Sequence, residues 1–552
     1  MNNLFRKKSV EKVLADAASG LSDAEHKSAA LNRTLSVRDL TAFGIAAVVG
    51  AGIFSTIGKA SFDGGPGIVL LFIFVAVACG FSALCYAEFA SMVPVSGSAY
   101  TYSYVAFGEI VAWIIGWDLL MEYSIGNIAV AISWSDYFTS LLDGFGWHIP
   151  DFITMDYWTA QAQESAPAIA AWTGAPQFAG IRFICDLPAF MIVVLITYIT
   201  YIGIRESRNS ANLMVLLKLA VIFLVVAVGA FYVKPENWSP FLPNGISGVL
   251  RGTAAVFFAY IGFDAISTTA EECKDPQRDL PRSMIYSLVI CTVIYVAVAL
   301  VLTGMVSYTK LDVGDPLAFV FQELNMNWFA GVIAFSAVIA TASVMLVFQL
   351  GQPRIWMSMS RDGLLPKVFS KIHPKYQTPS FSTILTGIVV AVPALFLNMN
   401  VVIDLTSVGT LFAFVLVNAG ILKLQMDPNR LTPAFKVRFI NGKYILPIMV
   451  VGGLALAWYF NPGGFRSIDF SSWEALRKVV PYFLFVVLAC TVAVMGFMYS
   501  FSLIPALGLL SCSYLLCESG VSNWERFLLW LLLGLVVYFL YGRRKSKLAP
   551  GA

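Results

Sequence analysis

The sequence predicts an all-α, polytopic membrane protein with about fourteen transmembrane helices. Of its 552 residues, 58% are hydrophobic and 12% are charged, whereas soluble domains carry roughly 25% charged residues. Apolar runs near 20 residues, the length a helix needs to cross a bilayer, recur along the chain. Lys and Arg are concentrated in the short segments between these runs. Lipid, and not water, is therefore the expected solvent for most of the chain.

The apolar runs are separated by charged or turn-forming residues. Each run is expected to be helical, because backbone polar groups inside a bilayer must be satisfied within the segment. The predicted spans are 41–62, 67–93, 105–138, 183–203, 209–233, 246–270, 283–306, 328–357, 379–398, 401–425, 443–461, 479–498, 500–517 and 524–541. The charged segment before them does not resemble a signal peptide and is expected to be cytoplasmic.

The positions of the basic residues test how these spans are oriented across the membrane. With a cytoplasmic start, 26 of the 36 Lys and Arg residues lie on the cytoplasmic side and eight on the external side, with Lys59 and Lys218 inside spans. This asymmetry follows the positive-inside rule. The sequence therefore predicts a multi-pass protein of the cell membrane with both termini in the cytoplasm.

Charge and cysteine content exclude several other classes. The formal net charge of +3 is too small to indicate a nucleic-acid partner. The eight cysteines lie mostly inside apolar runs, without the paired spacing of a metal site or a disulfide framework. No metal is expected.

Two spans carry glycine in the middle of the membrane. The first contains Gly50 and Gly52 on either side of Ala51, and the sixth contains Gly262. Glycine lets a helix unwind at low cost, but small residues at short spacing also let helices cross closely, and the first span alone leaves both readings open. Five helices separate the interruptions, which is the offset of an inverted repeat of five plus five helices whose first members are broken.

The ends of two broken helices favour a bound zwitterion. Unpaired N–H groups at the start of a half-helix attract a carboxylate, and unpaired carbonyls attract an ammonium group. The carboxylate is expected at the N–H groups around Ala51 and Gly52, and the ammonium at the carbonyls near Val48, Phe258, Ala259 and Ile261, with Ile53 as a further substrate-binding candidate. Asp264 is expected to cap the second half-helix.

A lone basic residue, Lys218, lies inside the fifth span. An ionisable residue at this depth is costly and indicates function by default. One reading is an amine that binds and releases a proton during transport, held by carbonyls near Gly44 or Ile45 and by a hydroxyl such as that of Ser343. The other is a helix-end anchor whose ammonium reaches the membrane surface.

The long third span carries two acidic residues, Asp118 and Glu122, one helical turn apart. Either is suited to shuttling protons or to contacting a basic substrate side chain. The alternative is a carboxylate satisfied by a neighbouring hydroxyl such as that of Tyr123, and the sequence leaves both readings open.

Several segments resemble the cationic amino acid transporters of the amino acid, polyamine and organocation superfamily, especially its bacterial members. The resemblance is strong over roughly 35–430 and weak beyond it. The matching segments are 38–54, 94–100, 257–264, 271–272, 276–282, 352–354, 361–366 and 404–411.

This resemblance implies a leucine-transporter-like inverted repeat with four additional C-terminal helices. The implied organisation is a cytoplasmic tail at 1–40, five-helix repeats at 41–237 and 245–425, four further helices at 440–542 and a second cytoplasmic tail at 543–552.

The resemblance also implies roles for individual residues. Relatives carry a fifth-helix lysine in the place of a sodium ion, which implies proton coupling, and Lys218 matches that position. Phe258 would close over the substrate as a gate, as in relatives. Candidates for reading the substrate side chain are Glu122, Thr341 and Ala342.

The expected function is import of an amino acid by proton symport with alternating access. An exchanger of amino acids or amines is the alternative, and small neutral and cationic substrates both stay open. A channel or a membrane enzyme fits less well, because the sequence has no phosphate-binding loop, metalloprotease motif or nucleophile elbow. No cofactor besides the proton gradient is expected, and the oligomeric state stays open.

Overall fold

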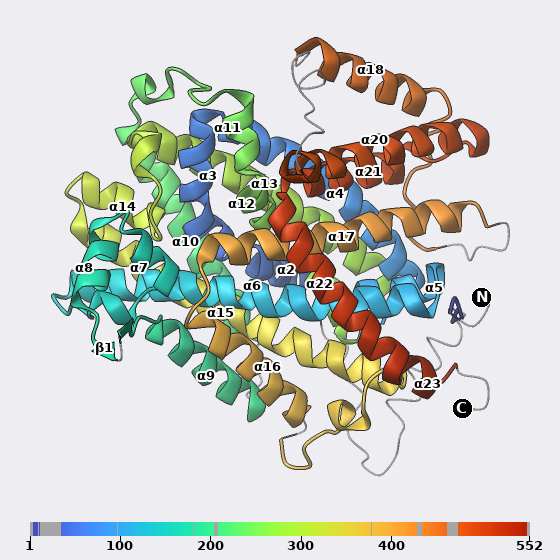
Figure 1. The fold of residues 1–552 in the computed structure, drawn as a ribbon, viewed down its shortest axis with the longest axis horizontal. Helices are drawn as coiled ribbons and strands as arrows, with labels where there is room; N and C mark the ends of the chain where they lie inside the picture. Colours follow the sequence, from blue (N-terminus) through green and yellow to red (C-terminus); the bar gives the residue numbers. More distant parts are fainter. Residues whose placement is uncertain are drawn as a thin grey trace.

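A computed structural model describes residues 4–8, 10, 35–95, 98–178, 180–203, 208–376, 378–427, 433–460 and 473–548. These residues form a bundle of helices, with one small hairpin of strands β1 (Gln177–Phe178) and β2 (Ile181–Arg182) (Figure 1). The protein is therefore all-α and polytopic, as predicted.

The helices of the first half begin with an interrupted one. Their bounds are α2 Val37–Val48, η1 Gly52–Thr56, α3 Ile57–Gly64, α4 Ile68–Met92, α5 Ser98–Ala106, α6 Glu109–Gly144, α9 Leu187–Tyr201 and α10 Arg208–Gly229. The loop between α6 and α9 contains η3 (Asp151–Ile153), α7 (Tyr157–Ala162), α8 (Ala166–Gly174) and the hairpin.

The second half also begins with an interrupted helix. Its elements are α11 Gly245–Arg251, α12 Thr253–Phe258, η6 Phe263–Glu272, α13 Pro276–Met305, α14 Pro316–Glu323, α15 Asn327–Arg361, α16 Ser380–Ala394 and α17 Met399–Gln425. The C-terminal helices are α18 Ile445–Phe460, α20 Trp473–Tyr499, α21 Leu503–Glu518 and α22 Val521–Val537, which continues through η9 Tyr538–Gly542 into α23 Arg543–Lys545.

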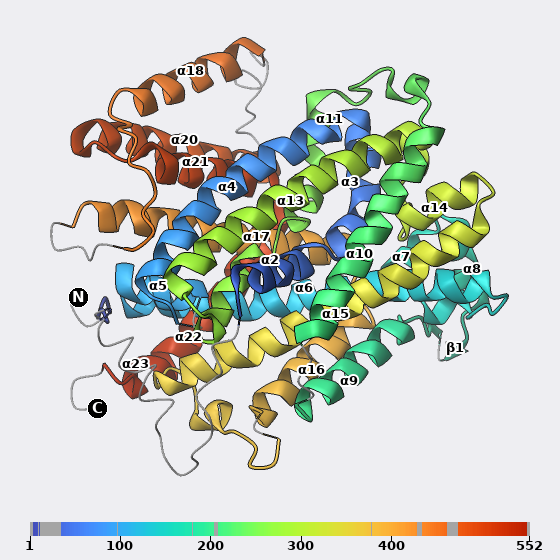
Figure 2. The same ribbon diagram turned by 180° about the vertical axis from the view of Figure 1, so that it is seen from behind.

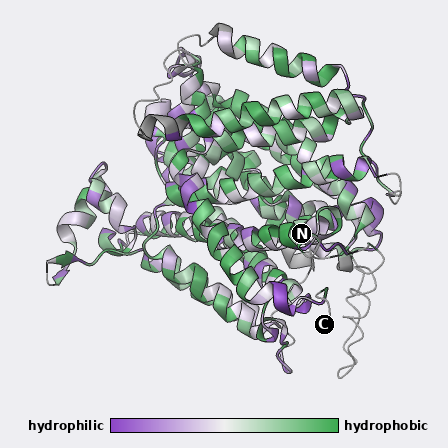
Figure 3. Ribbon diagram, turned by 45° about the vertical axis from the view of Figure 1, so that its right-hand side comes forward, coloured by the Kyte–Doolittle hydropathy of each residue, from purple (hydrophilic) through white to green (hydrophobic). Residues whose placement is uncertain are grey.

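Each of the fourteen predicted spans falls on one of these helical segments. Eight helical stretches of the described chain are long and apolar enough to cross a membrane, and four more apolar helices are shorter. The third span differs from prediction at both ends: the chain turns at Gly108 (φ 102°), and α6 then continues to Gly144, beyond the expected end at 138. Most of the helical ribbon consists of hydrophobic residues (Figure 3), and many large apolar side chains are exposed on the helices.

Helices at equivalent positions of the two halves pack against each other. The pairs are α4 with α13, α6 with α15, and α9 with α16 (Figure 2). In the order of the predicted spans these are the second with the seventh, the third with the eighth and the fourth with the ninth. This pairing agrees with two halves related by a pseudo-two-fold axis, while the repeat boundaries themselves stay a prediction.

Both ends of the described chain lie at one end of the bundle. Glu109 is the first residue of α6. Its carboxylate accepts a hydrogen bond from Ser546 Oγ (2.5 Å), and its backbone N–H donates to the carbonyl of Arg6 (2.9 Å). Asp362 Oδ1 pairs with Lys8 Nζ at 2.5 Å. The two ends of the described chain are therefore joined to the same end of the bundle by side-chain contacts.

Candidate functional site

The first helix is interrupted at Val49 and Gly50, as the glycine pair predicts. Val49 leaves helical geometry (φ −80°, ψ 88°). The carbonyl of Gly50 then accepts hydrogen bonds from the N–H groups of Ile53 and Phe54, both at 3.1 Å, and starts the next half-helix. The N–H groups of Ala51 and Gly52 stand at its amino end, where a helix supplies no acceptor.

Three carbonyls at the end of α2 accept hydrogen bonds from side chains of other helices. Lys218 Nζ donates to the carbonyls of Ala46 (3.0 Å) and Val49 (3.1 Å). The hydroxyl of Tyr295, on α13, donates to the carbonyl of Val48 (2.9 Å). The carbonyl that was expected to bind an ammonium at Val48 therefore already has one donor.

The sixth span is interrupted between Phe258 and Phe263. Gly262 has a φ of 117°, which side chains rarely tolerate, and a Cβ there would lie 3.0 Å from the carbonyl carbon of Ala47. The carbonyl of Phe258 accepts from the N–H of Ile261 (3.2 Å), so it is less available than expected. The carbonyls of Ala259 and Ile261 accept no hydrogen bond from any residue in the described part of the chain.

The two interruptions touch directly. A Cβ added at Gly52 would lie 2.4 Å from the Cα of Ala259, so the backbones are in contact at this point. Thr56 Oγ1 lies 2.8 Å from the carbonyl oxygen of Gly52 and 3.2 Å from that of Ala255, and so bridges the two helices. Unwinding and close crossing, the two readings of the glycine pair, both hold here.

Lys218 points toward the break and not toward the membrane surface. Its side chain is 0% exposed, and its Nζ also lies 3.2 Å from Ser343 Oγ on α15, the hydroxyl that was expected. The carbonyls were expected near Gly44 or Ile45; Ala46 directly follows Ile45, and Val49 lies about one helical turn beyond it. The Ile45 carbonyl is taken by the N–H of Val49, and Gly44 packs against Ser287 on α13.

Asp118 and Glu122 are both buried on α6. Both carboxylate oxygens of Asp118, and Oε2 of Glu122, have no hydrogen-bond partner among the described residues. Tyr123 does not satisfy Glu122, but the hydroxyl of Thr410 on α17 hydrogen-bonds to its carboxylate, so the alternative of a carboxylate satisfied by a neighbouring hydroxyl is supported for Glu122. The ring of Tyr123 instead packs edge-on against Phe348. Glu122 makes no hydrogen bond to either interruption within the described chain.

Asp264 does not occupy the capping position. The residue that precedes η6 is Gly262, and Asp264 lies inside the first turn. Its carboxylate nevertheless accepts hydrogen bonds from backbone N–H groups at this end of the helix, including those of Gly262 and Ala265, so it satisfies helix-end donors from inside the first turn.

Thr341 uses its hydroxyl within its own helix, donating to the Ala337 carbonyl (2.7 Å). The α15 residue that faces the first break is Val344, whose Cγ2 would lie 2.8 Å from a Cβ at Gly50. The structure thus brings the first interruption against the second at Gly52 and Ala259. The other predicted residues of the two interruptions, Val48, Ala51, Ile53, Phe258 and Ile261, are buried beside them, whereas Glu122 and Thr341 lie on α6 and α15.

Sequence reasoning missed three residues at the site. Tyr295 and Val344 are distant in the chain from the helix they contact, and Tyr137 donates its hydroxyl to the carbonyl of Phe54 (2.5 Å). The available signal was chemical: a tyrosine inside an apolar span needs an acceptor for its hydroxyl, and an interrupted helix supplies one.

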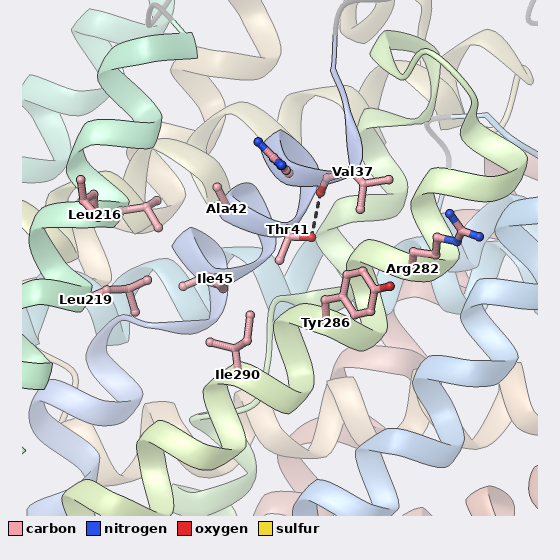
Figure 4. Close-up of a pocket in the computed structure, with 11 residues that line it drawn as sticks. Val37, Thr41, Ala42, Ile45, Leu216, Leu219, Arg282, Tyr286 and Ile290 are labelled. Atoms are coloured by element: carbon pink, nitrogen blue, oxygen red, sulfur yellow. Dashed lines mark hydrogen bonds between the residues drawn. The ribbon is translucent and has the colours of Figure 1, made fainter.

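An apolar groove of about 650 Å³ runs along the outside of α2, between α10 and α13 (Figure 4). Ile45 of α2, Leu219 of α10 and Ile290 of α13 line it. None of the predicted binding residues line this groove, which makes it distinct from the two interruptions. Helix α2 therefore has open space, and not another helix, along part of its length.

Comparison with known proteins agrees with this architecture. Residues 35–501 match the amino acid permease family, and residues 502–546 match the C-terminal region of amino acid permeases. The chain is 44% identical to a methylthioribose transporter of Bacillus subtilis, over 88% of this chain and 98% of the relative. It is 40% identical to the branched-chain amino acid permease BcaP of the same organism, over 99% of both chains.

A more distant relative is the vacuolar cationic amino acid transporter 2 of Arabidopsis thaliana, 32% identical over 100% of this chain and 94% of the relative. The family models together cover nearly the whole chain, including the four C-terminal helices. This protein belongs to the amino acid permease family of the amino acid, polyamine and organocation superfamily.

Proposed function

We propose that this protein imports an amino acid across the cell membrane by proton symport with alternating access, with both termini in the cytoplasm. The observation that carries the proposal is the placement of Lys218. Its ammonium ties α10 to the broken end of α2 through the carbonyls of Ala46 and Val49. A titratable group is thereby joined to the helix that holds the predicted carboxylate seat.

In this mechanism, protonation sets which conformation is favoured. Charged Lys218 holds α2 against α10 and, through Ser343, against α15. A neutral amine donates more weakly to the same carbonyls, so loss of the proton frees α2 to tilt into the adjacent apolar groove. The proton then biases two conformations by its differential affinity for them, which is the only way a ligand shifts such an equilibrium.

The substrate is held by backbone groups. Its carboxylate accepts from the N–H groups of Ala51 and Gly52, and its ammonium donates to the carbonyls of Ala259 and Ile261. Phe258, the last residue of α12, closes over it. All of these residues are buried, which corresponds to a closed state of the site. Binding opens the contact between Gly52 and Ala259 enough to admit the ligand.

A ligand screen can identify which substrate, and therefore which side chain, the site binds. A thermal-shift screen against the twenty amino acids reports binding, because a ligand that binds only the folded state raises its stability. Methylthioribose belongs in the same screen, because a 44% identical relative is named for its transport. A preference for Lys or Arg that disappears in Glu122→Gln would identify Glu122 as the residue that reads the side chain.

Transport in liposomes tests the coupling. Uptake against a concentration gradient that requires an inward proton gradient and no internal substrate supports symport. Uptake that occurs only when substrate is loaded inside indicates the exchanger, and flux that never saturates indicates a channel. Either of these results contradicts the proposal.

A further inference from the structure

The loop between α6 and α9 is a small folded unit at the end of the bundle away from the chain termini. It has its own apolar core, which includes Ala160, Ala171 and Ile184. Its connection to the bundle is firm: the N–H of Asp186, immediately before α9, donates to the carbonyl of Leu395 beyond α16 (3.0 Å). The unit therefore has a fixed position relative to α9 and α16.

The hairpin of this unit has one polar and one apolar face. Gln177 is paired with Arg182, and Phe178 with Ile181, so the two pairs lie on opposite faces. The guanidinium of Arg182 donates to the carbonyl of Trp172 and lies 4.7 Å from the centre of its ring. The polar face is therefore turned toward α8, and the apolar face is turned outward.

The apolar face of the hairpin is strongly exposed and lies next to the exposed apolar face of α9. Phe178 is 87% exposed and Ile181 71% exposed. Phe183, also exposed, comes four residues before α9 and so lies within about 14 Å of its first residue along the chain. Figures 1 and 2 both place β1 beside the amino end of α9.

Helix α9 continues the same surface along its length. Its exposed apolar residues recur at the spacing of one helical face, which is the face that lipid covers. They are Leu187, Met191, Val194, Leu195 and Tyr198.

We propose that the apolar face of the hairpin, Phe178 and Ile181, inserts into the headgroup region of the leaflet on this side of the membrane. Its continuity with the lipid-facing face of α9 argues for lipid as the occupant. Two residues per strand also present far less area than the roughly 800 Å² per partner that a stable protein interface needs. Aromatic and aliphatic side chains at this depth anchor a segment at the interface. The proposal does not depend on what is transported.

Spin labelling tests the proposal in the full-length protein in liposomes of neutral phospholipid. Cys490 is the only exposed cysteine among the described residues, so Cys490→Ser supplies the background. Nitroxides are placed by Phe178→Cys and Ile181→Cys, with Gln161→Cys on α7 as an exposed polar control. The accessibility of each label to oxygen, which dissolves in lipid, and to a water-soluble nickel chelate is measured.

Insertion predicts that both hairpin labels are about tenfold less accessible to the nickel chelate than the Gln161 label, with higher accessibility to oxygen. Nickel accessibility equal to that of the control would mean that the hairpin stands in water. Low accessibility to both reagents would mean that protein covers it. Either of these two results overturns the proposal.

Discussion

Replacement of Lys218 by alanine should uncouple transport from the proton gradient. The variant loses two hydrogen bonds from a charged donor to the carbonyls of Ala46 and Val49. Such bonds contribute about 1.5–3 kcal/mol each. If they form in only one of the two conformations, their loss shifts the equilibrium by about 3–6 kcal/mol, or roughly 160- to 25,000-fold. The free energy of unfolding falls by less than about 3–6 kcal/mol, because the variant also no longer bears the cost of burying a charged ammonium group away from water.

The assay is uptake into liposomes with the internal pH clamped, with and without an inward proton gradient. The wild type should accumulate substrate, whereas Lys218→Ala should bind substrate in a thermal-shift assay without accumulating it. Lys59→Ala is the matched control, because Lys59 lies on α3 and pairs with Asp63 at 3.3 Å, away from the breaks. Accumulation by Lys218→Ala equal to that of the wild type would refute the coupling role.

Three further variants test the remaining assignments. Phe258→Ala should raise the apparent KM for uptake by about tenfold or more, from lost apolar burial, and an unchanged KM and rate would make Phe258 ordinary packing. Gly52→Ala places a Cβ 2.4 Å from the backbone of the facing helix, so overpacking should lower the free energy of unfolding by about 1–3 kcal/mol, and the Tm with it. Gly331→Ala, with nothing within 4 Å, is the control, and equal Tm values for the two variants would contradict the contact. Glu109→Gln should lower the Tm by about 2 °C or more, because a buried carboxylate loses charge-assisted hydrogen bonds, whereas Glu323→Gln, an exposed ion-pair residue, should not, and a Tm unchanged in both would make the Glu109 cluster incidental.

The many apolar helices and their order along the chain could be predicted from the sequence, because the bilayer imposes the same chemistry and a minimum length on every span. The position of the first break could be predicted from Gly50 and Gly52, although the residue that leaves helical geometry is Val49 and neither glycine has a positive φ. The direct contact of Gly52 with Ala259 could not be predicted, because two small residues 207 positions apart carry no information about their register.

The hydrogen-bond partners of Lys218 could be predicted from the sequence only in part. The chemistry predicted carbonyls from the first helix and a hydroxyl from the eighth span, and Ser343 is in place. The particular carbonyls depend on where α2 stops, and helix ends are the least predictable part of an element. Tyr295 was missed because its role depends on the packing of α13 against α2, which no local pattern encodes.

The carboxylate of Glu109 also has a consequence for the order in which the protein is assembled. Its hydroxyl partners Tyr538 and Ser546 follow it by 429 and 437 residues. At about 5–20 residues per second, a ribosome reaches them roughly 20–90 s after Glu109 is made. During that interval the start of α6 is paired only with nearby groups such as Tyr104. Closure of this cluster is thus a late step of biogenesis, and it reports that the C-terminal helices have joined the bundle.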